Sequence, residues 1–189
     1  MHPFRAFLQA YVPLTEEDWI EIEDKITREV VDKDALILAE GSVCRHLYFL
    51  ETGLLRFFRL KDGEEITKFF TLEPYLFTSQ KSFNDRTPAA ESIQAIEQSI
   101  IWKMTYEDAN ALLKLTSWNT FVRKIVQEVQ YYTEQLLIDM QSETAEDRYK
   151  TMLQRSPQLV QRIPLKYLAS YLGIAPQSLS RIRKSLTQA

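Results

Sequence analysis

The sequence predicts an α+β protein in which an N-terminal β jelly roll, a long helix and an all-α C-terminal segment follow one another. Short β-rich runs from about Leu36 to Met104 are separated by turn residues at regular intervals, as in an all-β sandwich or jelly roll. Neither Pro nor Gly occurs from about Ser117 to Ser142, as expected for one long helix. Two short helical patterns meet at Gly173. The predicted division is residues 1–115, 116–142 and 143–189.

Length and composition are those of an ordinary globular protein. The 189 residues suit two modest domains, and 45% apolar with 26% charged residues indicates neither disorder nor a membrane protein. No apolar run reaches the roughly 18 residues that a membrane span requires. The start Met1–Phe4 lacks a basic segment followed by a long apolar stretch, so we expect no secretory signal, no membrane contact and a cytoplasmic location.

The charge is distributed unevenly along the chain. The net charge is −3, yet Arg162–Ala189 holds five basic residues and no acidic one, which leaves −8 for residues 1–161. Such an asymmetry lets a small C-terminal segment approach phosphate groups while the acidic remainder keeps the protein soluble. The C-terminal segment is therefore a candidate nucleic-acid interface.

The first 115 residues are predicted to form helix, strands and helix again. Residues 3–29 have the pattern of one or two short helices, with Thr15 as the N-cap before an acidic first turn. Asp62–Gly63 lies between two apolar runs and favours a type I′ hairpin turn, which needs positive φ at both central residues. Residues 105–114 resemble a short helix, after which no further strand is predicted.

The long helix carries the pattern of a coiled coil. Its apolar side chains alternate in steps of three and four residues, at Val122, Ile125, Val129, Tyr132 and Leu136. Such a helix could pack alone on its own sandwich or pair with the same helix of a second copy. Because it is longer than the surface of a small β domain, we predict a homodimer with these residues in the interface.

A further helix is predicted over Glu143–Ser156 and ends at Pro157, and Pro164 opens a final pair of helices. Ala169 is small where the second helix of this pair would cross closest, and Gly173 can adopt the positive φ that ends the first helix. The apolar residues that would hold the two helices together are Leu168, Leu172, Ile174, Leu179 and Ile182. This pattern is typical of a helix-turn-helix.

The outward face of the last predicted helix is polar and contains no acidic residue. In a helix-turn-helix such side chains enter the major groove, where Gln pairs with adenine and Arg with guanine. The candidate base-reading residues are Gln177, Ser178, Ser180 and Arg181. The candidates for contacts with the DNA backbone are Lys166, Tyr167, Ser170, Arg183 and Lys184. The alternative is an ordinary helical hairpin with a solvated basic face.

The order of a β sandwich, a long helix and a C-terminal helix-turn-helix resembles the Crp/Fnr family of transcription regulators over nearly the whole chain. The resemblance implies a cyclic-nucleotide-binding-type jelly roll as sensor domain, a dimer formed through the long helix, and recognition of a near-palindromic DNA site. It also implies that Gln177, Ser180 and Arg181 contact bases. The expected partners are duplex DNA, a second copy of the chain, RNA polymerase and an unidentified small-molecule effector.

The expected effector region departs from the pattern that the resemblance implies. Nucleotide-binding members have a Gly-Glu pair and an Arg-Ser-Ala stretch that hold the ribose and the cyclic phosphate, whereas Thr78–Ser79 and Ala89–Glu91 stand there here. A buried phosphate that faces a carboxylate and lacks its arginine is poorly compensated, so cyclic AMP is not the expected effector, although Arg86 could substitute from a shifted register. The candidate pocket comprises Phe77, Ser79, Phe83 and Arg86, unless its aromatic side chains fill it themselves.

A second departure lies at the C-terminus. The resemblance implies a β-hairpin wing after the recognition helix, but only Thr187–Ala189 follow Leu186. We therefore expect a wingless reading head or a shortened chain, with an affinity that depends on the dimer. The cysteines that hold an iron–sulfur cluster in the oxygen-sensing branch are missing, since Cys44 is the single cysteine.

Enzymatic chemistry is not expected. Cys44 is more typical of a small buried residue in a strand, and His2 and His46 lack a metal-binding spacing. No catalytic residue, metal site or cofactor is predicted. A cupin-like metal enzyme would need clustered ligands, which two distant histidines do not supply. A sensor that acts only through protein contacts is the other alternative, in which an acidic partner would bind the basic helix.

Overall fold

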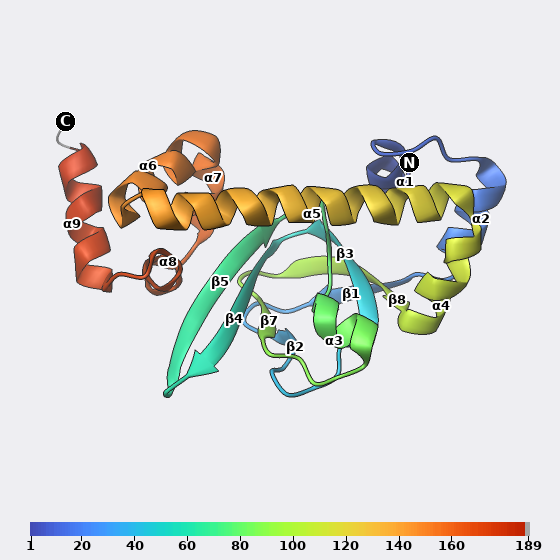
Figure 1. The fold of residues 1–189 in the computed structure, drawn as a ribbon, viewed down its shortest axis with the longest axis horizontal. Coiled ribbons are helices and arrows are strands. Elements are labelled where there is room, and N and C mark those ends of the chain that lie inside the picture. Colours follow the sequence, from blue (N-terminus) through green and yellow to red (C-terminus); the bar gives the residue numbers. More distant parts are fainter. Residues whose placement is uncertain (188–189) are drawn as a thin grey trace.

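The computed structural model describes residues 1–187, and Figure 1 shows one long helix running above a β sandwich, with further helices gathered at both ends. The helices are α1 (Pro3–Gln9), α2 (Glu16–Glu23), α3 (Gln80–Asp85), α4 (Tyr106–Ala111), the 3₁₀ turn η1 (Leu112–Lys114), α5 (Thr116–Ser142), α6 (Ala145–Arg155), α7 (Pro157–Arg162), α8 (Leu165–Leu172) and α9 (Pro176–Thr187). The strands are β1 (Thr27–Val31), β2 (Leu36–Leu38), β3 (His46–Thr52), β4 (Leu54–Lys61), β5 (Glu64–Leu72), β6 (Tyr75–Phe77), β7 (Ser92–Ala95) and β8 (Ser99–Thr105).

The sandwich has the jelly-roll arrangement that the sequence predicts. Its two four-stranded antiparallel sheets are ordered β1-β8-β3-β6 and β2-β7-β4-β5. Most neighbouring strands are thus distant in the sequence. The predicted hairpin turn between β4 and β5 is confirmed, since Asp62 has φ +53° and Gly63 φ +81°. Gly53 makes the tight turn from β3 to β4 with φ +120°, where a Cβ atom would overlap Ser99.

Strand β1 is an element that the sequence analysis missed. The helical prediction for residues 3–29 is confirmed for α1 and α2, including the Thr15 cap, whose hydroxyl accepts from the Asp18 N–H at 3.1 Å. It is wrong at the end of this range, where Thr27–Val31 pairs with β8 at the edge of its sheet. Four of its five residues are exposed, so the strand lacks the alternation of apolar and polar residues that predicts a strand.

Aromatic side chains fix α5 to the sandwich. Trp118 and Phe121 in the first turns of α5 are buried, with their ring centroids 6.3 and 6.5 Å from that of Phe4 in α1. Phe4 in turn stacks on Phe49 of β3 at 4.9 Å. Burial of each such side chain stabilises the fold by about 1.5–3 kcal/mol. The N-terminal end of the long helix is therefore held firmly, and the remainder extends toward the C-terminal helices (Figure 1).

The C-terminal helices share a core with the sandwich. Helix α6 begins with a capping box between Thr144 and Asp147. Helix α6 ends at Arg155, before Pro157 as predicted, and Pro157 occupies the first turn of the short helix α7, where its missing N–H costs nothing. Leu54 and Ile96 of the sandwich region belong to the same buried cluster as the apolar residues of α6 to α9. Within residues 1–187, no helix is long and apolar enough to cross a membrane.

Candidate functional site

The C-terminal helical pair consists of α8, a short turn and α9. Gly173 ends α8 with φ +73°, and the N–H groups of Gly173 and Ile174 donate to carbonyls of α8. Leu168, Ala169 and Leu179 are fully buried in the core that joins the two helices. The turn and the apolar contacts predicted from the sequence are confirmed. The predicted absence of a wing concerns the residues after Thr187, which lie outside the described part of the chain.

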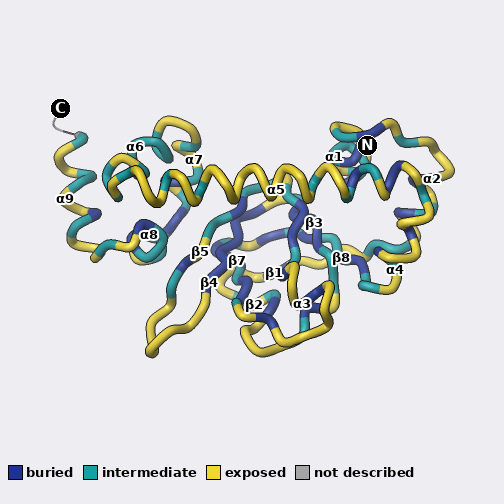
Figure 2. Tube along the Cα trace, in the orientation of Figure 1, coloured by how far each residue is buried: buried dark blue, intermediate teal, exposed yellow. Residues whose placement is uncertain are grey.

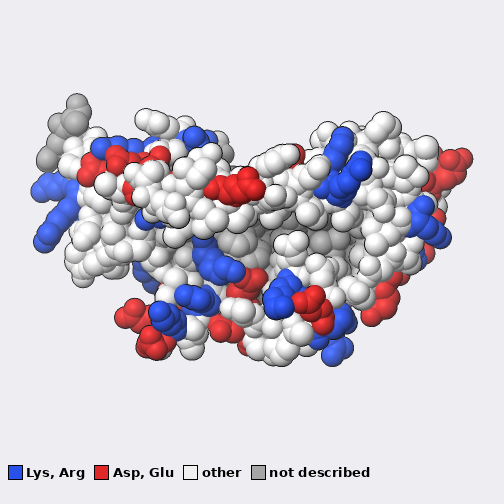
Figure 3. Space-filling model, viewed as in Figure 1, with Lys and Arg blue, Asp and Glu red and all other residues white. Residues whose placement is uncertain are grey.

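The outer face of α9 presents most of the predicted base-reading residues to solvent. Gln177, Ser180 and Arg181 are exposed, and Ser178 is half-buried. Helix α9 lies at one end of the molecule (Figure 1), where Figure 3 shows Lys and Arg side chains on the surface. No acidic residue occurs in α9, so this face is polar and positively charged.

The five residues predicted to contact the DNA backbone differ in their surroundings. Lys166 and Lys184 are exposed, whereas Arg183 is half-buried with its guanidinium 5.7 Å from an aromatic ring of α6. Tyr167 and Ser170 face the β4–β5 hairpin of the same chain rather than open solvent. A contact of these two side chains with DNA stays a prediction, and it requires them to leave their present partners.

Ser170 connects α8 to the free edge of β5. Its hydroxyl accepts a hydrogen bond from the Thr67 N–H at 2.9 Å and donates one to the Glu65 carbonyl at 2.9 Å. Strand β5 lies at the edge of its sheet, so these backbone groups have no neighbouring strand on that side. The serine satisfies them, and α8 thereby covers an edge that would otherwise be open.

Arg56 fills the space between α8 and the sandwich. Its side chain is fully buried, with the guanidinium carbon 3.6 Å from the Tyr167 ring centroid and 4.0 Å from that of Phe58. Nη2 donates to the Glu65 carboxylate at 2.7 Å and to Gln94 at 2.8 Å, while Nε and Nη1 are buried and have no hydrogen-bond partner among residues 1–187. The sequence analysis missed this residue, because its only signal is one arginine within an apolar strand.

Arg162 is a second link between the C-terminal helices and the sandwich. Its guanidinium contacts the Glu97 carboxylate at 2.5 Å and the Glu73 carboxylate at 3.2 Å. These hydrogen bonds, that to Glu97 first, raise the pKa of Arg162. The sequence analysis counted Arg162 with the basic C-terminal segment, but its charge is neutralised by carboxylates of the sandwich. The free positive charge therefore lies further along the chain.

The aromatic residues of the predicted effector pocket fill their own space. Phe77 is buried, stacks on Tyr48 at 5.0 Å and meets Phe57 edge-on at 6.1 Å. Phe83 is also buried and packs edge-on against Tyr106 at 5.2 Å. These contacts favour the alternative in which side chains, rather than an effector, occupy the interior.

The two polar residues of this predicted pocket bind different partners. The Ser79 hydroxyl donates to the Glu91 carboxylate at 2.9 Å, and Lys68 forms an ion pair with the same carboxylate. Arg86 instead lies over an aromatic ring of α4 at 4.7 Å and donates to the Cys44 carbonyl at 3.3 Å. A largely buried carboxylate and its cation thus stand where the resemblance implies a ribose and a phosphate.

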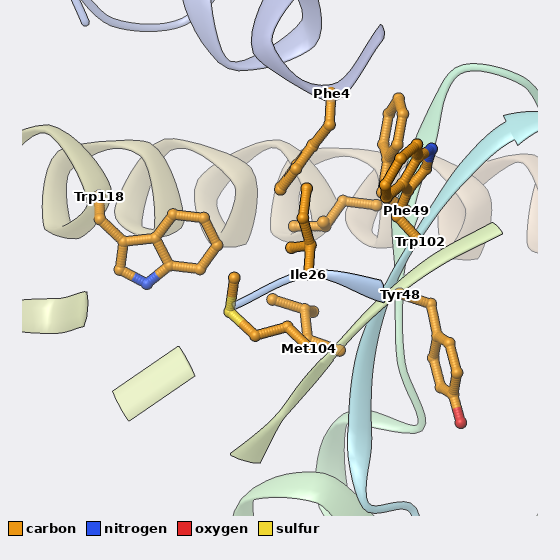
Figure 4. Close-up of a pocket in the computed structure, with 9 residues that line it drawn as sticks. Phe4, Ile26, Tyr48, Phe49, Trp102, Met104 and Trp118 are labelled. Atoms are coloured by element: carbon orange, nitrogen blue, oxygen red, sulfur yellow. The ribbon is translucent and has the colours of Figure 1, made fainter. Parts of the chain in front are cut away.

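Figure 4 shows a second void of the sandwich region, between α1, α5 and the sheet that contains β3 and β8. Aromatic and aliphatic side chains, among them Phe4, Trp102, Met104 and Trp118, converge on it. Its volume is about 10 Å³. That is room for about one water molecule, so this void is a packing defect of the core rather than a ligand site.

The five residues predicted for a dimer interface differ in burial along α5. Val122 and Ile125 pack on the core of their own sandwich, and Leu136 is half-buried. Val129 is 37% exposed and Tyr132 55%. Figure 2 shows that α5 is exposed along most of its middle part. The first turns of the helix thus pack on their own sandwich, whereas the side chains around Val126 and Val129 are left partly uncovered by residues 1–187. Pairing with a second copy stays a prediction.

Comparison with known proteins identifies the sandwich. Residues 28–115 match the family of the cyclic nucleotide-binding domain. Among curated proteins no significant match is found. Similar solved structures include the catabolite activator protein of Thermus thermophilus, with a TM-score of 0.59, 21% identity, and coverage of 94% of this chain and 86% of that chain.

Two further structures are similar over most of their length. FixK2 of Bradyrhizobium japonicum has a TM-score of 0.71 and 17% identity, and the match covers 86% of this chain and 85% of that chain. A protein described as a transcriptional regulator of the Crp/Fnr family from Eubacterium rectale has a TM-score of 0.73 and 17% identity, with coverage of 94% and 88%. Residues 28–115 are thus similar to the cyclic nucleotide-binding domain, and the chain has the fold that these solved structures share.

Proposed function

We propose that this chain is a sequence-specific DNA-binding transcription regulator of the Crp/Fnr type. Residues 1–115 serve as sensor domain, residues 116–142 as dimerisation helix and residues 143–189 as helix-turn-helix domain. The observation that carries the proposal is the acid-free outer face of α9, which offers Gln177 and Arg181 to solvent at one end of the molecule. Their amide and guanidinium groups match the acceptors and donors on base edges in the major groove.

The proposal includes a homodimer that reads a near-palindromic site. Two copies of the helical pair would lie about 34 Å apart, one turn of B-DNA, so that both α9 helices enter the major groove on the same side. Lys166 and Lys184 are exposed and would contact phosphates. A dimer is also favoured because one helical pair alone would make few phosphate contacts, and a second copy would double their number.

The structure supports a dimer seam that is rotated from the one predicted. The exposed residues Val126, Val129, Thr133 and Met140 follow one another in steps of three, four and seven, and form one stripe on α5. Val126 is 46% exposed and Met140 58%. The stripe from Val126 to Met140 is roughly 21 Å long, so pairing would bury its side chains over about four turns of α5. Of the residues predicted for the seam, Val129 belongs to this stripe, and the half-buried Leu136 takes the position between Thr133 and Met140.

Replacing Val129 with glutamate is expected to dissociate the dimer. Two valines would lose their burial and two carboxylates would face each other across a twofold axis, at a cost of about 3–6 kcal/mol, or more than 100-fold in dimer affinity. Light scattering coupled to size exclusion should then give one chain of 22.2 kDa instead of two. Tyr131→Glu is the control, because Tyr131 is 65% exposed on the opposite side of the helix. A wild-type monomer, or equal masses for both variants, would contradict the seam.

The effector of this regulator is proposed to be something other than cyclic AMP. Ala89–Glu91 stand in place of the phosphate-binding stretch of nucleotide-binding members, and the Glu91 carboxylate is already held by Ser79 and Lys68. A cyclic phosphate placed against this carboxylate would meet like charge. The ion pair between Lys68 and Glu91 would have to break before the Lys68 ammonium group could bind the phosphate of a nucleotide.

Selection from a random duplex library tests the function. The purified chain is expected to enrich a site with twofold symmetry, and its affinity for that site should fall steeply with salt, because binding releases counterions from several phosphates. Retention of the enriched duplex over a scrambled one at 150 mM salt would distinguish specific from general binding. Enrichment of no sequence, or binding that does not depend on salt, would contradict the proposal and favour a sensor that acts through protein contacts.

A further inference from the structure

A cavity lies outside the jelly roll, where α5, α6, α8 and the edge strand β5 meet. Its volume is about 210 Å³, compared with the about 10–15 Å³ that one water molecule needs. It can therefore hold a molecule of many atoms. The side chains that determine its chemistry are Phe70, Tyr132, Tyr171, Asp139, Arg148 and Arg155.

The apolar part of the cavity is aromatic. Phe70 from β5 and Tyr171 from α8 meet edge-on with ring centroids 5.8 Å apart, and Tyr132 of α5 adds a third ring. Burial raises the pKa of Tyr171 to about 12 and raises the pKa of Tyr132 as well. Both phenols are thus protonated at neutral pH, and because Tyr171 interacts with Tyr132 through its hydroxyl, the Tyr132 hydroxyl is the one that can donate to a ligand. This wall suits an apolar group with a polar neighbour.

The polar part of the cavity carries charges of both signs on separate helices. Arg148 and Arg155 lie seven residues apart on α6, hence on one face of that helix, and Asp139 and Glu143 lie four apart at the end of α5. Among residues 1–187, no ion pair within 4.0 Å joins either arginine to either carboxylate. Opposite charges therefore line the cavity without neutralising each other.

The guanidinium of Arg148 is incompletely satisfied. Its Nη2 donates to the Leu172 carbonyl at 2.7 Å, while its Nε is buried without a hydrogen-bond partner in the described part of the chain. A guanidinium can donate five hydrogen bonds, and a carboxylate matches two of them in parallel. An anionic group in the cavity would add a compensating charge beside α6.

We propose that this cavity binds a small zwitterion of the amino-acid or short-peptide class. Its carboxylate would face Arg148 and Arg155, its ammonium group would face Asp139 and Glu143, and its apolar side chain would lie against the aromatic wall. Because α5, α6, α8 and β5 all contribute to the cavity, the bound molecule stabilises the present position of the C-terminal helices on the sandwich. Any effect of the bound zwitterion on DNA binding rests on the proposed function, whereas the binding of the zwitterion to the cavity does not.

A second copy of the chain would border this space in the proposed dimer. The cavity uses Tyr132, Leu136 and Asp139, which recur at steps of four and three along one row of α5. Leu136 also lies three residues after Thr133 and four before Met140, so it lies where this row meets the dimer stripe. Tyr132 and Asp139 lie further around α5 from Val126 and Thr133, so pairing along the stripe leaves their side of the cavity open to a small molecule. Occupation by the partner is an outcome that the experiment can detect.

Isothermal titration calorimetry without DNA tests the proposal, with L-leucine, L-phenylalanine and the dipeptide Leu-Phe as probes. At least one should bind at or below millimolar concentration and raise the melting temperature of the protein. The amide-capped N-acetyl derivative of the same amino acid lacks both charges and should bind at least tenfold more weakly. Cyclic AMP, added in excess, should not displace the probe, because the region where a cyclic nucleotide would be expected lies inside the jelly roll and not at this cavity.

Arg155→Gln provides the site-specific test. Arg155 is exposed at the rim of the cavity, so the variant should fold, and the loss of one charge-assisted hydrogen bond should weaken the probe about tenfold or more. Arg123→Gln, an exposed arginine on α5 away from the cavity, is the matched control and should bind as the wild type does. Absence of binding for all three probes, equal binding by both variants, or binding only to protein made monomeric by Val129→Glu would overturn the proposal. If the protein binds its selected DNA site but none of the zwitterions, the zwitterion site is wrong and the proposed function still stands.

Discussion

Arg181→Ala is expected to weaken binding to the selected DNA site by about 5–150-fold for each half-site, and by the product of two such factors for the dimer. A guanidinium that contacts a guanine through two hydrogen bonds contributes about 1–3 kcal/mol of discrimination, and a homodimer makes the contact twice. Arg181 is exposed on the outer face of α9, so its removal leaves the core of the helical pair unchanged. Fluorescence anisotropy with the selected duplex measures the loss.

The pattern of the loss matters as much as its size. With Arg181→Ala, one base pair in each half-site should cease to matter, while the other positions keep their preference. Lys184→Ala is the control, because an exposed lysine near the end of α9 is expected to contact phosphate; its loss should weaken all duplexes alike and reduce the dependence on salt. If Arg181→Ala weakens all duplexes alike instead, Arg181 contacts the DNA backbone and another residue reads the base.

The parts of the fold that depend on local chemistry could be predicted from the sequence. The turn at Asp62–Gly63 needs positive φ at two residues, and the end of α8 at Gly173 needs it at one, so residue type alone locates both. The long helix follows from the absence of Pro and Gly between Thr116 and Ser142. In each case the constraint acts within a few residues, which is the range that a single sequence can report.

The contacts between the C-terminal helices and the sandwich could not be predicted. Tyr167 and Ser170 have the residue types and spacing of a DNA-contacting helix, and nothing nearby in the sequence indicates that their partners are Arg56, Glu65 and Thr67. These contacts join residues about a hundred positions apart, 103 for Ser170 with Thr67. Only the folded hairpin brings them together, so the amphipathic pattern of α8 could not distinguish a face for DNA from a face for its own sandwich.

Arg56→Ala is expected to release α8 from the β4–β5 hairpin. The substitution removes the stacking of the guanidinium on the rings of Tyr167 and Phe58, and the hydrogen bonds to Glu65 and Gln94. The ring contacts contribute about 0.5–2 kcal/mol each and the charge-assisted bond about 1.5–3 kcal/mol. Two guanidinium nitrogens without partners reduce this gain, so the net weakening is about 2–4 kcal/mol.

Amide hydrogen exchange measures this release directly. The Thr67 N–H, which donates to Ser170, and the amides of α8 should exchange about 30–1000-fold faster in Arg56→Ala, while the amides of β8 should keep their wild-type rates. Arg59→Ala removes an exposed arginine from the same strand and should change neither region. Equal rates in α8 for both variants would show that Ser170 and Arg162 hold the helix without Arg56. Faster exchange in β8 as well would show that Arg56 supports the sandwich as a whole.

If α8 alone is released, Tyr167 and Ser170 become available to DNA. The affinity of Arg56→Ala for the selected duplex should then exceed that of the wild type, because the wild type must break these contacts before its backbone-contacting residues can bind.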